Sequence, residues 1–327
     1  MADRFGVVGI GNALVDVLAQ VDDGFLAAEA VTKGAMTLID QERAGGLYAA
    51  MPPARELSGG SGANTAAALA QLGVSTGYIG KVAEDQLGQI FTHDMRALGA
   101  RFGGPMVGPE ETGRCLVLIT PDGERSMNTF LGISVTLEPE DIDTEMTAAA
   151  DWLYLEGYLF DTDAAKAAYA RAIESCRAGG GRISFTVSDG FCVERHREDM
   201  SRLVRDHVDL LFANRGELLA LYETDDLDTA MARVAGDVEM AAVTLSEDGA
   251  VVVRGEERFA VPTVAQSVID TTGAGDLFAA GFLAGQVAGR GPADCARMGC
   301  VAAAEIISHI GARPEADLRA LMAEAGL

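Results

Sequence analysis

The segment DTTGAGDLFAAGFLAG, residues 270–285, sets three small residues directly before an aspartate, and that aspartate opens an apolar run with helical character. The first turn of a helix leaves about four backbone N–H groups without partners and carries roughly half a positive charge. Gly273, Ala274 and Gly275 have almost no side chain to shield those groups, so the turn is suited to bind an anion. A glycine turn followed by an aspartate N-cap is the simpler interpretation, and the segment alone does not separate the two.

Asp276 would repel a phosphate bound at this turn unless its carboxylate faces the substrate instead. A carboxylate beside an alcohol takes the hydroxyl proton as the oxygen attacks, while the bare amides stabilise the phosphoryl group in transfer. Such transfer is catalysed mostly by positioning and charge stabilisation, and a general base contributes typically ~10²–10⁴-fold. We therefore expect Asp276 to be the base of a phosphoryl-transfer site, and Asp276→Asn to keep nucleotide binding and lose turnover.

The chain has 327 residues, of which 49% are hydrophobic, and is long enough for one large α/β domain. Short apolar strands alternate with helical segments, which predicts a mostly parallel central sheet covered by helices on both faces. Two regions break this rhythm, at about 12–40 and 105–135, and the second contains a hairpin with Pro121-Asp122-Gly123 as its turn. Because no linker or repeat divides the sequence, we expect one domain over residues 1–327, with these insertions pairing into a small β-sheet lid.

Acidic residues number 49 and basic residues 25, which gives a net charge of -24. A chain this acidic does not attract nucleic acid or anionic lipid, so a phosphorylated ligand needs local cations or a metal ion. No apolar stretch approaches the roughly 20 residues that cross a bilayer, and residues 1–16 lack a signal-peptide layout, so we expect a cytoplasmic protein without a membrane partner. The five cysteines and four histidines have neither disulfide-framework nor zinc-ligand spacing.

Polar side chains follow the first predicted strand, at the edge where ligands gather in a parallel sheet. The stretch GIGNAL, residues 9–14, begins like a dinucleotide fingerprint, but Leu14 stands where the third glycine belongs, and the sequence holds no P-loop motif. Asn12 and Asp16 can instead hydrogen-bond the vicinal hydroxyls of a sugar, and loop capping is an equally good interpretation. The stretch GGSGANTA, residues 59–66, either brings Asn64 into the same cleft or makes only a tight turn before a helix.

Two further strand ends carry groups suited to a nucleotide. In ANRGE, residues 213–217, Asn214 and Glu217 share one face of the following helix, and both offer oxygen to a hydrated Mg²⁺. An asparagine N-cap with a glutamate in the first turn has the same spacing, and spacing alone favours that interpretation. In VTLSEDG, residues 243–249, the hydroxyl groups of Thr244 and Ser246 can donate to phosphate oxygens.

Three of these motifs together resemble signatures of the ribokinase-like, or PfkB-type, carbohydrate and nucleoside kinases. DTTGAGDLFAAGF resembles the family's C-terminal signature, GGSGANTAAALAQLGVSTGYIGKVAEDQLG (residues 59–88) its N-terminal signature and ANRGE its N-x-x-E motif, and the likeness covers essentially the whole chain. Within the family, GNALVD and DDGFLAAEAVTKGAMTLID (residues 22–40) are most similar to the adenosine kinase branch. The resemblance implies a three-layer α/β/α ribokinase-like fold with a small β-sheet lid.

The resemblance also implies a role for each motif residue. It makes Asp276 the catalytic base and gives the anion hole to Gly273, Ala274 and Gly275. The implied substrate-binding residues are Asn12, Asp16, Gly60 and Asn64 for the ribose, Met36 and Leu38 for a purine, and Arg125, in the lid hairpin, for the phosphates as the lid closes. The implied cofactor residues are Asn214, Thr244, Ser246 and Gly249 for ATP, Asn214 and Glu217 for Mg²⁺ held through water, and Asp270 and Thr272 for a monovalent cation such as K⁺.

The sequence departs from the family pattern at two positions, Ala83 and Ser246, where the signatures usually have glycine. We expect an ATP-dependent kinase that phosphorylates the 5′-hydroxyl of adenosine, giving AMP and ADP. A sugar kinase of the same family, acting on ribose, fructose or 2-keto-3-deoxygluconate, is the main alternative. A sensor that binds nucleosides or sugars without catalysis is more distant, because it would be expected to lose Asp276, and a dehydrogenase is the weakest reading. The sequence leaves open whether the protein is a monomer or a homodimer.

Overall fold

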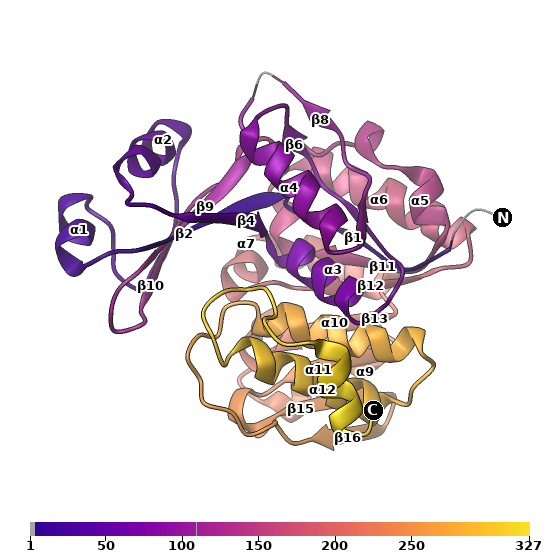
Figure 1. Cartoon of the computed structure of the whole chain (residues 1–327). Coiled ribbons are helices and arrows are strands. Elements are labelled where there is room, and N and C mark those ends of the chain that lie inside the picture. The colour runs from indigo at the N-terminus through magenta and orange to yellow at the C-terminus, as the bar shows by residue number, and fades with distance from the viewer. Residues whose placement is uncertain (1–3, 109) are drawn as a thin grey trace.

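The computed structural model describes residues 4–108 and 110–327; the predicted ranges 1–327 and 105–135 therefore include residues 1–3 and 109, which lie outside the described part (Figure 1). Its centre is a nine-stranded sheet with the order β16-β15-β14-β13-β12-β11-β1-β5-β7. Neighbouring strands run parallel from β7 to β14, while β15 and β16 pair antiparallel at one edge. The strands are β1 (Phe5–Ile10), β5 (Thr76–Ile79), β7 (Ala100–Phe102), β11 (Ala150–Glu156), β12 (Arg182–Thr186), β13 (Leu210–Asn214), β14 (Met240–Thr244), β15 (Ala250–Arg254) and β16 (Glu257–Val261).

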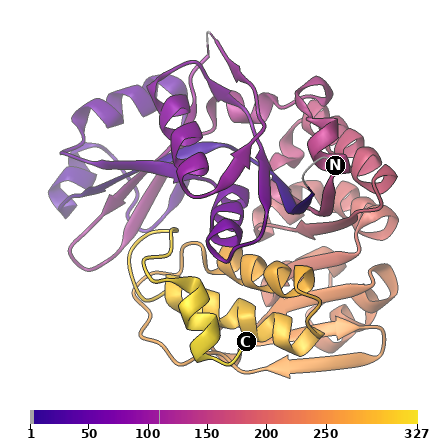
Figure 2. The same cartoon turned by 45° about the vertical axis from the view of Figure 1, so that its right-hand side comes forward.

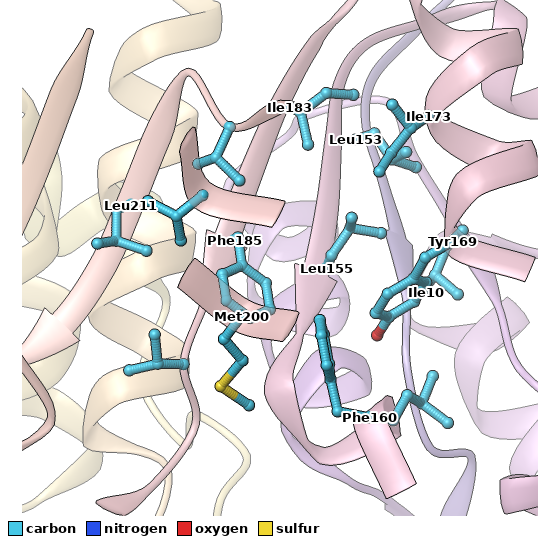
Figure 3. Packing of buried hydrophobic residues seen from close by; sticks show 14 of the residues in the cluster. Ile10, Leu153, Leu155, Phe160, Tyr169, Ile173, Ile183, Phe185, Met200 and Leu211 are labelled. Carbon is cyan, nitrogen blue, oxygen red and sulfur yellow. The ribbon is translucent and has the colours of Figure 1, made fainter. Parts of the chain in front are cut away.

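Both faces of this sheet are buried under helices. Strand β11 shows why, since Trp152 and Tyr154 point to one face, Leu153 and Leu155 point to the other, and all four are buried. One face packs against α3 (Ser61–Gln71), α10 (Ala274–Val287), α11 (Pro292–Ile306) and α12 (Leu318–Glu324). The other packs against α5 (Thr144–Ala148), α6 (Asp163–Ala178), α7 (Gly190–His207), α8 (Arg215–Tyr222) and α9 (Leu227–Asp237), as Figures 2 and 3 show. The predicted three-layer α/β/α architecture is confirmed.

Helix α6 illustrates how the local sequence produces these layers. Thr162 caps its N-terminus by accepting a hydrogen bond from the amide of Ala165, and glycines follow its last turn. Its buried residues recur at helical spacing along one stripe that packs onto the sheet: Ala165, Ala168, Tyr169, Ala172, Ile173 and Cys176. Figure 3 labels Tyr169 and Ile173 in this packing. The apolar period therefore fixes which face of the helix meets the sheet.

A second, five-stranded sheet with the order β3-β10-β9-β2-β4 projects from one side of the domain (Figure 1). Its strands are β2 (Leu14–Gln20), β3 (Met36–Leu38), β4 (Arg55–Gly59), β9 (Gly113–Ile119) and β10 (Arg125–Phe130). The predicted smaller sheet is thus present, and the insertions at 12–40 and 105–135 supply four of its strands. The prediction missed β4 and the helices α1 (Asp23–Ala28) and α2 (Gln41–Ala50), which flank β3.

The remaining elements connect these parts. Helix α4 (Gln86–Ala97) packs Phe91 against Tyr78 and Phe102, and the two-residue strands β6 (Val82–Ala83) and β8 (Met106–Val107) pair beside it. The 3₁₀ turns are Gly132–Thr136, Pro139–Asp141, Gly157–Asp161 and Ser246–Asp248. Strand β11 ends at Glu156 although the apolar run continues to Phe160, because the chain there turns into the third of these 3₁₀ segments.

All five cysteines are free and buried, and burial raises the pKa of each thiol. Within residues 4–108 and 110–327, no helix combines the length and the apolar character needed to cross a bilayer.

Candidate active site

A cleft of about 1640 Å³ opens between the smaller sheet and the carboxyl ends of the central strands. Strands β1, β11, β13 and β14 each end at this cleft, and the residues that follow or close them line it: Asn12, Glu156, Asn214 and Thr244. Ligands bind at this edge in open α/β sheets, where the strand ends of the fold converge. All of the site residues predicted from the sequence line the cleft except Asp270, whose carboxylate is buried just behind it.

Helix α10 begins at the bare turn that the sequence singled out. Gly273 is its N-cap and has a φ of 79°, in the left-handed region that glycine adopts without strain. Of the three predicted anion-hole amides, that of Ala274 is not free, because it donates to the carbonyl of Thr271 at 3.1 Å. The amides of Gly273, Gly275 and Asp276 have no acceptor within the described residues. A side chain at Gly275 would meet no other atom within 4 Å. Three unpartnered N–H groups therefore stand at an open helix tip, which is the arrangement that binds anions.

The carboxylate of Asp276 is held in place by helix α3. Its Oδ1 accepts from the Ser61 hydroxyl at 2.6 Å, and its Oδ2 accepts from Nδ2 of Asn64 at 2.9 Å. Burial raises the pKa of Asp276, while these two hydrogen bonds and the charge of Arg313 oppose the rise. The result is a carboxylate with a fixed direction and a pKa above that of an exposed aspartate, which suits a group that must accept a proton.

Glu156, at the end of β11, organises the opposite wall of the cleft, and the sequence analysis missed it. It is fully buried, its Oε1 accepts from the backbone and side-chain nitrogens of Asn12 at 2.8 and 3.2 Å, and its Oε2 accepts from the Gly62 amide at 2.6 Å. Burial raises the pKa of Glu156 to about 7, and the three donors limit the rise. Glu156 thus ties the loop after β1 to the start of α3. A single carboxylate closing the apolar strand DWLYLE was the signal available for it.

Asp16 points from β2 into the same part of the cleft. Burial raises its pKa to about 6, and the charges of Arg313 and Arg125 oppose that rise. Two glycines make room here, because a Cβ on Gly59 would lie 2.3 Å from the Asp16 carboxyl carbon. A Cβ on Gly60, which has a φ of 93°, would lie 2.3 Å from the carbonyl oxygen of Asn12. The glycines therefore allow the close approach of β4 to the loop that carries the polar groups.

Arg125, on β10, forms a buried ion pair with Asp270 rather than facing the cleft alone. Its Nη1 lies 2.8 Å from Oδ2 of Asp270, and the two side chains are 8% and 6% exposed. The second oxygen of Asp270 accepts from the amide and hydroxyl groups of Thr272 at 3.0 and 2.8 Å. The carboxylate predicted to help hold a monovalent cation is thus already neutralised by a guanidinium group. With both of its oxygens bonded in this way, Asp270 does not also fit a K⁺ ion, and the monovalent-cation site stays a prediction.

The ends of β13 and β14 form the side of the cleft that the sequence predicts to bind the nucleotide. Asn214 and Glu217 form a reciprocal capping box, with the Asn214 amide donating to Glu217 Oε2 at 2.8 Å and the Glu217 amide donating to Asn214 Oδ1 at 2.9 Å. Burial raises the pKa of Glu217 to about 7. Because both carboxylate oxygens already accept from Asn214, the pair fits Mg²⁺ through the ion's water shell rather than by direct ligation. No cluster of three or more metal-ligating side chains occurs in the part of the chain that the structure describes.

The two departures from family glycines have different structural consequences. Ser246 has a φ of 54°, in the left-handed region where glycine would be unstrained, so this turn carries a local cost. Gly249, three residues later, has a φ of 86°, and a Cβ there would lie 2.1 Å from the Val261 carbonyl oxygen. Ala83 lies in β6 without a positive φ, and its amide donates to the Thr112 hydroxyl at 2.9 Å.

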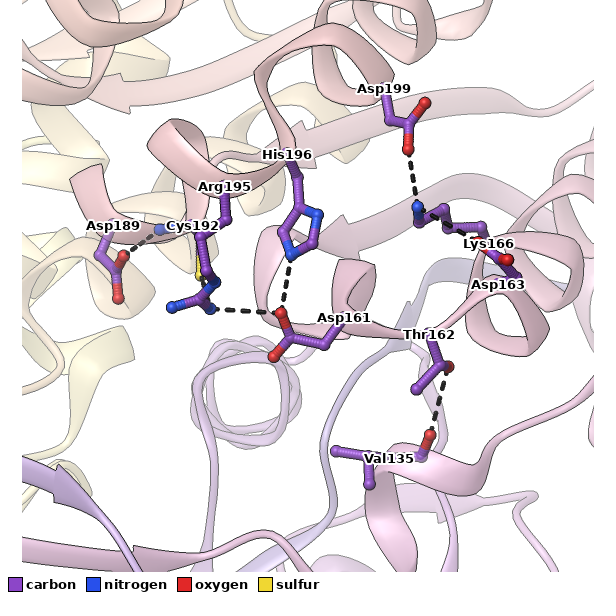
Figure 4. A network of polar contacts seen from close by, with 10 residues as sticks. All are labelled: Val135, Asp161, Thr162, Asp163, Lys166, Asp189, Cys192, Arg195, His196 and Asp199. Carbon is purple, nitrogen blue, oxygen red and sulfur yellow. Dashed lines mark hydrogen bonds and ion pairs between the residues drawn. The ribbon is translucent and has the colours of Figure 1, made fainter.

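The mouth of the cleft is apolar. Met36 and Leu38, on β3, are 49% and 53% exposed and line it, and so does Phe191, which is 72% exposed at the start of α7. The network in Figure 4 anchors this end of α7, where Asp161 accepts from His196 Nε2 at 2.7 Å and from Arg195 at 3.3 Å. Its anchored helix end therefore holds Phe191 at the rim, and sequence reasoning gave no sign of this residue.

Comparison with known proteins identifies the family of this chain and agrees with its fold. Residues 39–318 match the model of the pfkB family of carbohydrate kinases. The crystal structure of adenosine kinase from Sinorhizobium meliloti is 49% identical, covers 99% of this chain and 100% of its own, and superposes with a TM-score of 0.91. A probable sugar kinase from Rhizobium etli CFN 42 is 48% identical over 99% of both chains, with a TM-score of 0.92. Adenosine kinase 1 of Arabidopsis thaliana is 24% identical over 93% of this chain and 94% of its own length.

Proposed function

The chain belongs to the pfkB family of carbohydrate kinases, and from that premise we propose that its acceptor is adenosine, whose 5′-hydroxyl it phosphorylates with ATP to give AMP and ADP. The broader activity follows from the family itself: the protein is a phosphotransferase that acts on a hydroxyl group. The proposal concerns which hydroxyl compound enters the cleft and which residues act on it.

The observation that carries the proposal is the apolar mouth of an otherwise polar cleft. Met36, Leu38 and Phe191 expose about half or more of their surface there, although large apolar side chains are normally buried. A bare sugar carries hydroxyl groups around its whole ring and needs polar partners on every side. A purine has two apolar faces that pack against aliphatic and aromatic side chains, while its ribose needs hydrogen bonds at one end only. Asn12 and Asp16 offer those bonds deeper in the cleft.

The chemistry follows from the tip of α10. Asp276 accepts the proton of the 5′-hydroxyl as that oxygen forms its bond to the γ-phosphorus, and the bond between the γ-phosphorus and the bridging oxygen of ADP breaks. The free amides of Gly273, Gly275 and Asp276 are the donors available to stabilise the negative charge on the phosphoryl oxygens. Ser61 and Asn64 keep the carboxylate aimed, so the hydroxyl meets an acceptor of fixed geometry. Closure of the smaller sheet over the cleft would exclude water, which otherwise competes as acceptor.

A Mg²⁺ ion bound with ATP supplies neutralisation of the phosphate charge. Asn214 and Glu217 are the residues that would hold its water shell. This chain needs such help, since a net charge of -24 opposes the approach of ATP. Thr244 and Ser246, at the end of β14, are the hydroxyl donors on the same side of the cleft.

The test is ADP release from Mg·ATP with adenosine, inosine, ribose, fructose and 2-keto-3-deoxygluconate as acceptors. We expect the highest kcat/KM for adenosine. A clear preference for ribose, fructose or the sugar acid would refute the proposed acceptor and support the sugar kinase alternative, which the R. etli relative represents.

A variant pair sharpens this test. Leu38→Asn removes an apolar contact with the purine and should lower kcat/KM for adenosine on the order of tenfold, because a buried leucine side chain contributes about 1.5–3 kcal/mol. Turnover of ribose should not change. Leu98→Asn is the matched control, since Leu98 is 39% exposed at the end of α4 and lies outside the cleft. Equal losses for adenosine and ribose in Leu38→Asn would argue against a purine at this wall.

A further inference from the structure

Arg313 reaches the active site from the loop between α11 and α12, and none of the sequence motifs includes it. The loop packs directly on the catalytic turn, because a Cβ on Gly273 would lie 3.1 Å from the Cβ of Ala312. Arg313 donates through Nη2 to the carbonyl and hydroxyl oxygens of Ser58 at 2.6 and 3.0 Å, and through Nη1 to Oδ1 of Asn64. One guanidinium group thus joins this loop, strand β4 and helix α3.

The contact with Asn64 decides which way that amide faces. A guanidinium group only donates, so it requires the oxygen of Asn64 on its side. The nitrogen Nδ2 is then directed to Asp276, to which it donates at 2.9 Å. With the amide reversed, Nδ2 would face the guanidinium and Oδ1 would face the carboxylate, which makes two repulsive contacts instead of two hydrogen bonds.

We propose that Arg313 is a positioning residue for phosphoryl transfer, which holds Asn64 in the one orientation that donates to the carboxylate of Asp276. Arg313 acts through Asn64 and does not itself contact the reacting atoms. The inference rests on the proposed role of Asp276 as the base, and it adds a residue of the C-terminal loop to that machinery.

Charge reinforces the geometry. Arg313 is the cation that lowers the pKa of Asp276. The other titratable groups that interact with Asp276 from the surrounding elements are acidic or neutral: Asp16 on β2, Tyr78 on β5, Tyr154 and Glu156 on β11, and Tyr158 after β11. Removing the guanidinium would leave burial opposed only by the Ser61 and Asn64 hydrogen bonds. The pKa of Asp276 would then rise further, and more of the base would be protonated at a given pH.

The experiment compares the full-length wild type with Arg313→Met and Arg313→Lys, using ADP release with adenosine between pH 5 and 9. Arg313→Met should lower kcat about 10- to 100-fold, because small displacements of a catalytic group have losses of that order, and should move the acidic limb of the kcat/KM profile to higher pH. Arg313→Lys keeps the charge without the fork that spans Ser58 and Asn64. It should therefore keep the acidic limb near its wild-type position while recovering only part of kcat.

A double-mutant cycle with Asn64→Ala separates positioning from general stability. If Arg313 acts through Asn64, the double variant should lose little more kcat than the worse single variant. Arg319→Met is the matched control, since Arg319 also joins the C-terminal region to α3, through the Gln71 carbonyl at 2.9 Å, but away from the cleft. It should leave kcat and the pH profile unchanged, and thermal unfolding of every variant shows whether the fold survives.

The possible results distinguish the positioning role of Arg313 from the proposed function. Additive losses of kcat in the cycle, or an unmoved acidic limb in Arg313→Met, would overturn the positioning role while leaving the proposed function intact. If Arg313→Met does not fold, Arg313→Lys decides, and full wild-type kcat in that variant would overturn the role. A wild-type protein that transfers phosphate to no member of the acceptor panel would refute the proposed function itself.

Discussion

Replacing Glu156 with glutamine tests the view that one buried carboxylate organises the substrate wall. Glutamine keeps the shape of the side chain, and its oxygen can accept from the two Asn12 nitrogens, which donate to Glu156 Oε1 at 2.8 and 3.2 Å in the wild type. Its NH₂ group then faces the Gly62 amide, which donates to Glu156 Oε2 at 2.6 Å. A carboxyl oxygen can accept this bond in either protonation state, but an NH₂ group cannot, so the Gly62 amide would lose its acceptor. A buried donor left unsatisfied costs about 1–3 kcal/mol. We therefore expect Glu156→Gln to be less stable than the wild type at pH 5.

The pH dependence gives the sharper number. Burial raises the pKa of Glu156 from 4.5 to about 7, so the folded protein holds this proton more tightly than the unfolded chain does. The corresponding stability is fully present below the unfolded pKa of 4.5 and is lost as pH rises through about 7. One proton over that interval corresponds to roughly 3 kcal/mol at about 1.4 kcal/mol per pH unit. Glutamine does not titrate, so the variant lacks this part of the loss.

The assay is urea unfolding of the ligand-free wild type and Glu156→Gln at pH 5 and pH 8. From pH 5 to pH 8, the free energy of unfolding of the wild type should fall by roughly 3 kcal/mol relative to that of Glu156→Gln, because only the wild type loses the proton-linked stability. Glu174→Gln, an exposed change on α6, should show the wild-type pH dependence. A difference between wild type and Glu156→Gln that is the same at both pH values would refute the reasoning.

Three other substitutions test the catalytic turn and its surroundings. Asp276→Asn should lower kcat about 10²–10⁴-fold with an unchanged Kd for ATP, measured by ADP release and titration calorimetry, and near-wild-type turnover would remove Asp276 from the mechanism. Gly273→Ala places a side chain on left-handed backbone and should lower the free energy of unfolding by about 1–2 kcal/mol, whereas Gly275→Ala should not lower it. Equal urea midpoints for these two variants would contradict this expectation. Arg125→Met leaves Asp270 buried without its counter-ion, which should lower the free energy of unfolding by about 3–5 kcal/mol. K⁺ should then raise the Tm of this variant more than that of the wild type, and an equal response to K⁺ would contradict the prediction.

The layered fold was predictable because local patterns carried it. The apolar strand FGVVGI and the stripe along α6 each indicate their own element, and their alternation indicates a parallel sheet with helices on both faces. Strand β4 was missed because RELSG is half polar and lacks a clean alternation, and it forms a strand only through its pairing with β2. The 3₁₀ turn after Glu156 was missed because GYLF continues the apolar run of the strand before it.

The parts of the candidate site that lie within one glycine-rich motif were predictable from the sequence. The contacts between residues far apart in the sequence were not. Asp276 and its turn stand together in one motif, so the sequence alone predicts a bare helix start beside a carboxylate, and the structure places both at the cleft. Glu156 works through Asn12, 144 residues away, and Arg313 works through Asn64, 249 residues away. Nothing local distinguishes such residues from a strand-end carboxylate or a loop arginine. The pairing of Arg125 with Asp270 was equally hidden, because it depends on how the smaller sheet sits against the domain.

The burial of every cysteine has a practical consequence for labelling this enzyme with a fluorophore. Maleimide and related dyes react with the thiolate form. The native cysteines are at most 7% exposed, although Cys115, Cys192 and Cys300 line the cleft, and burial raises the pKa of every native thiol. A single Glu42→Cys change on exposed helix α2 would therefore give one readily labelled site without prior removal of native cysteines. A fluorophore there would show whether the smaller sheet moves when nucleotide and acceptor bind.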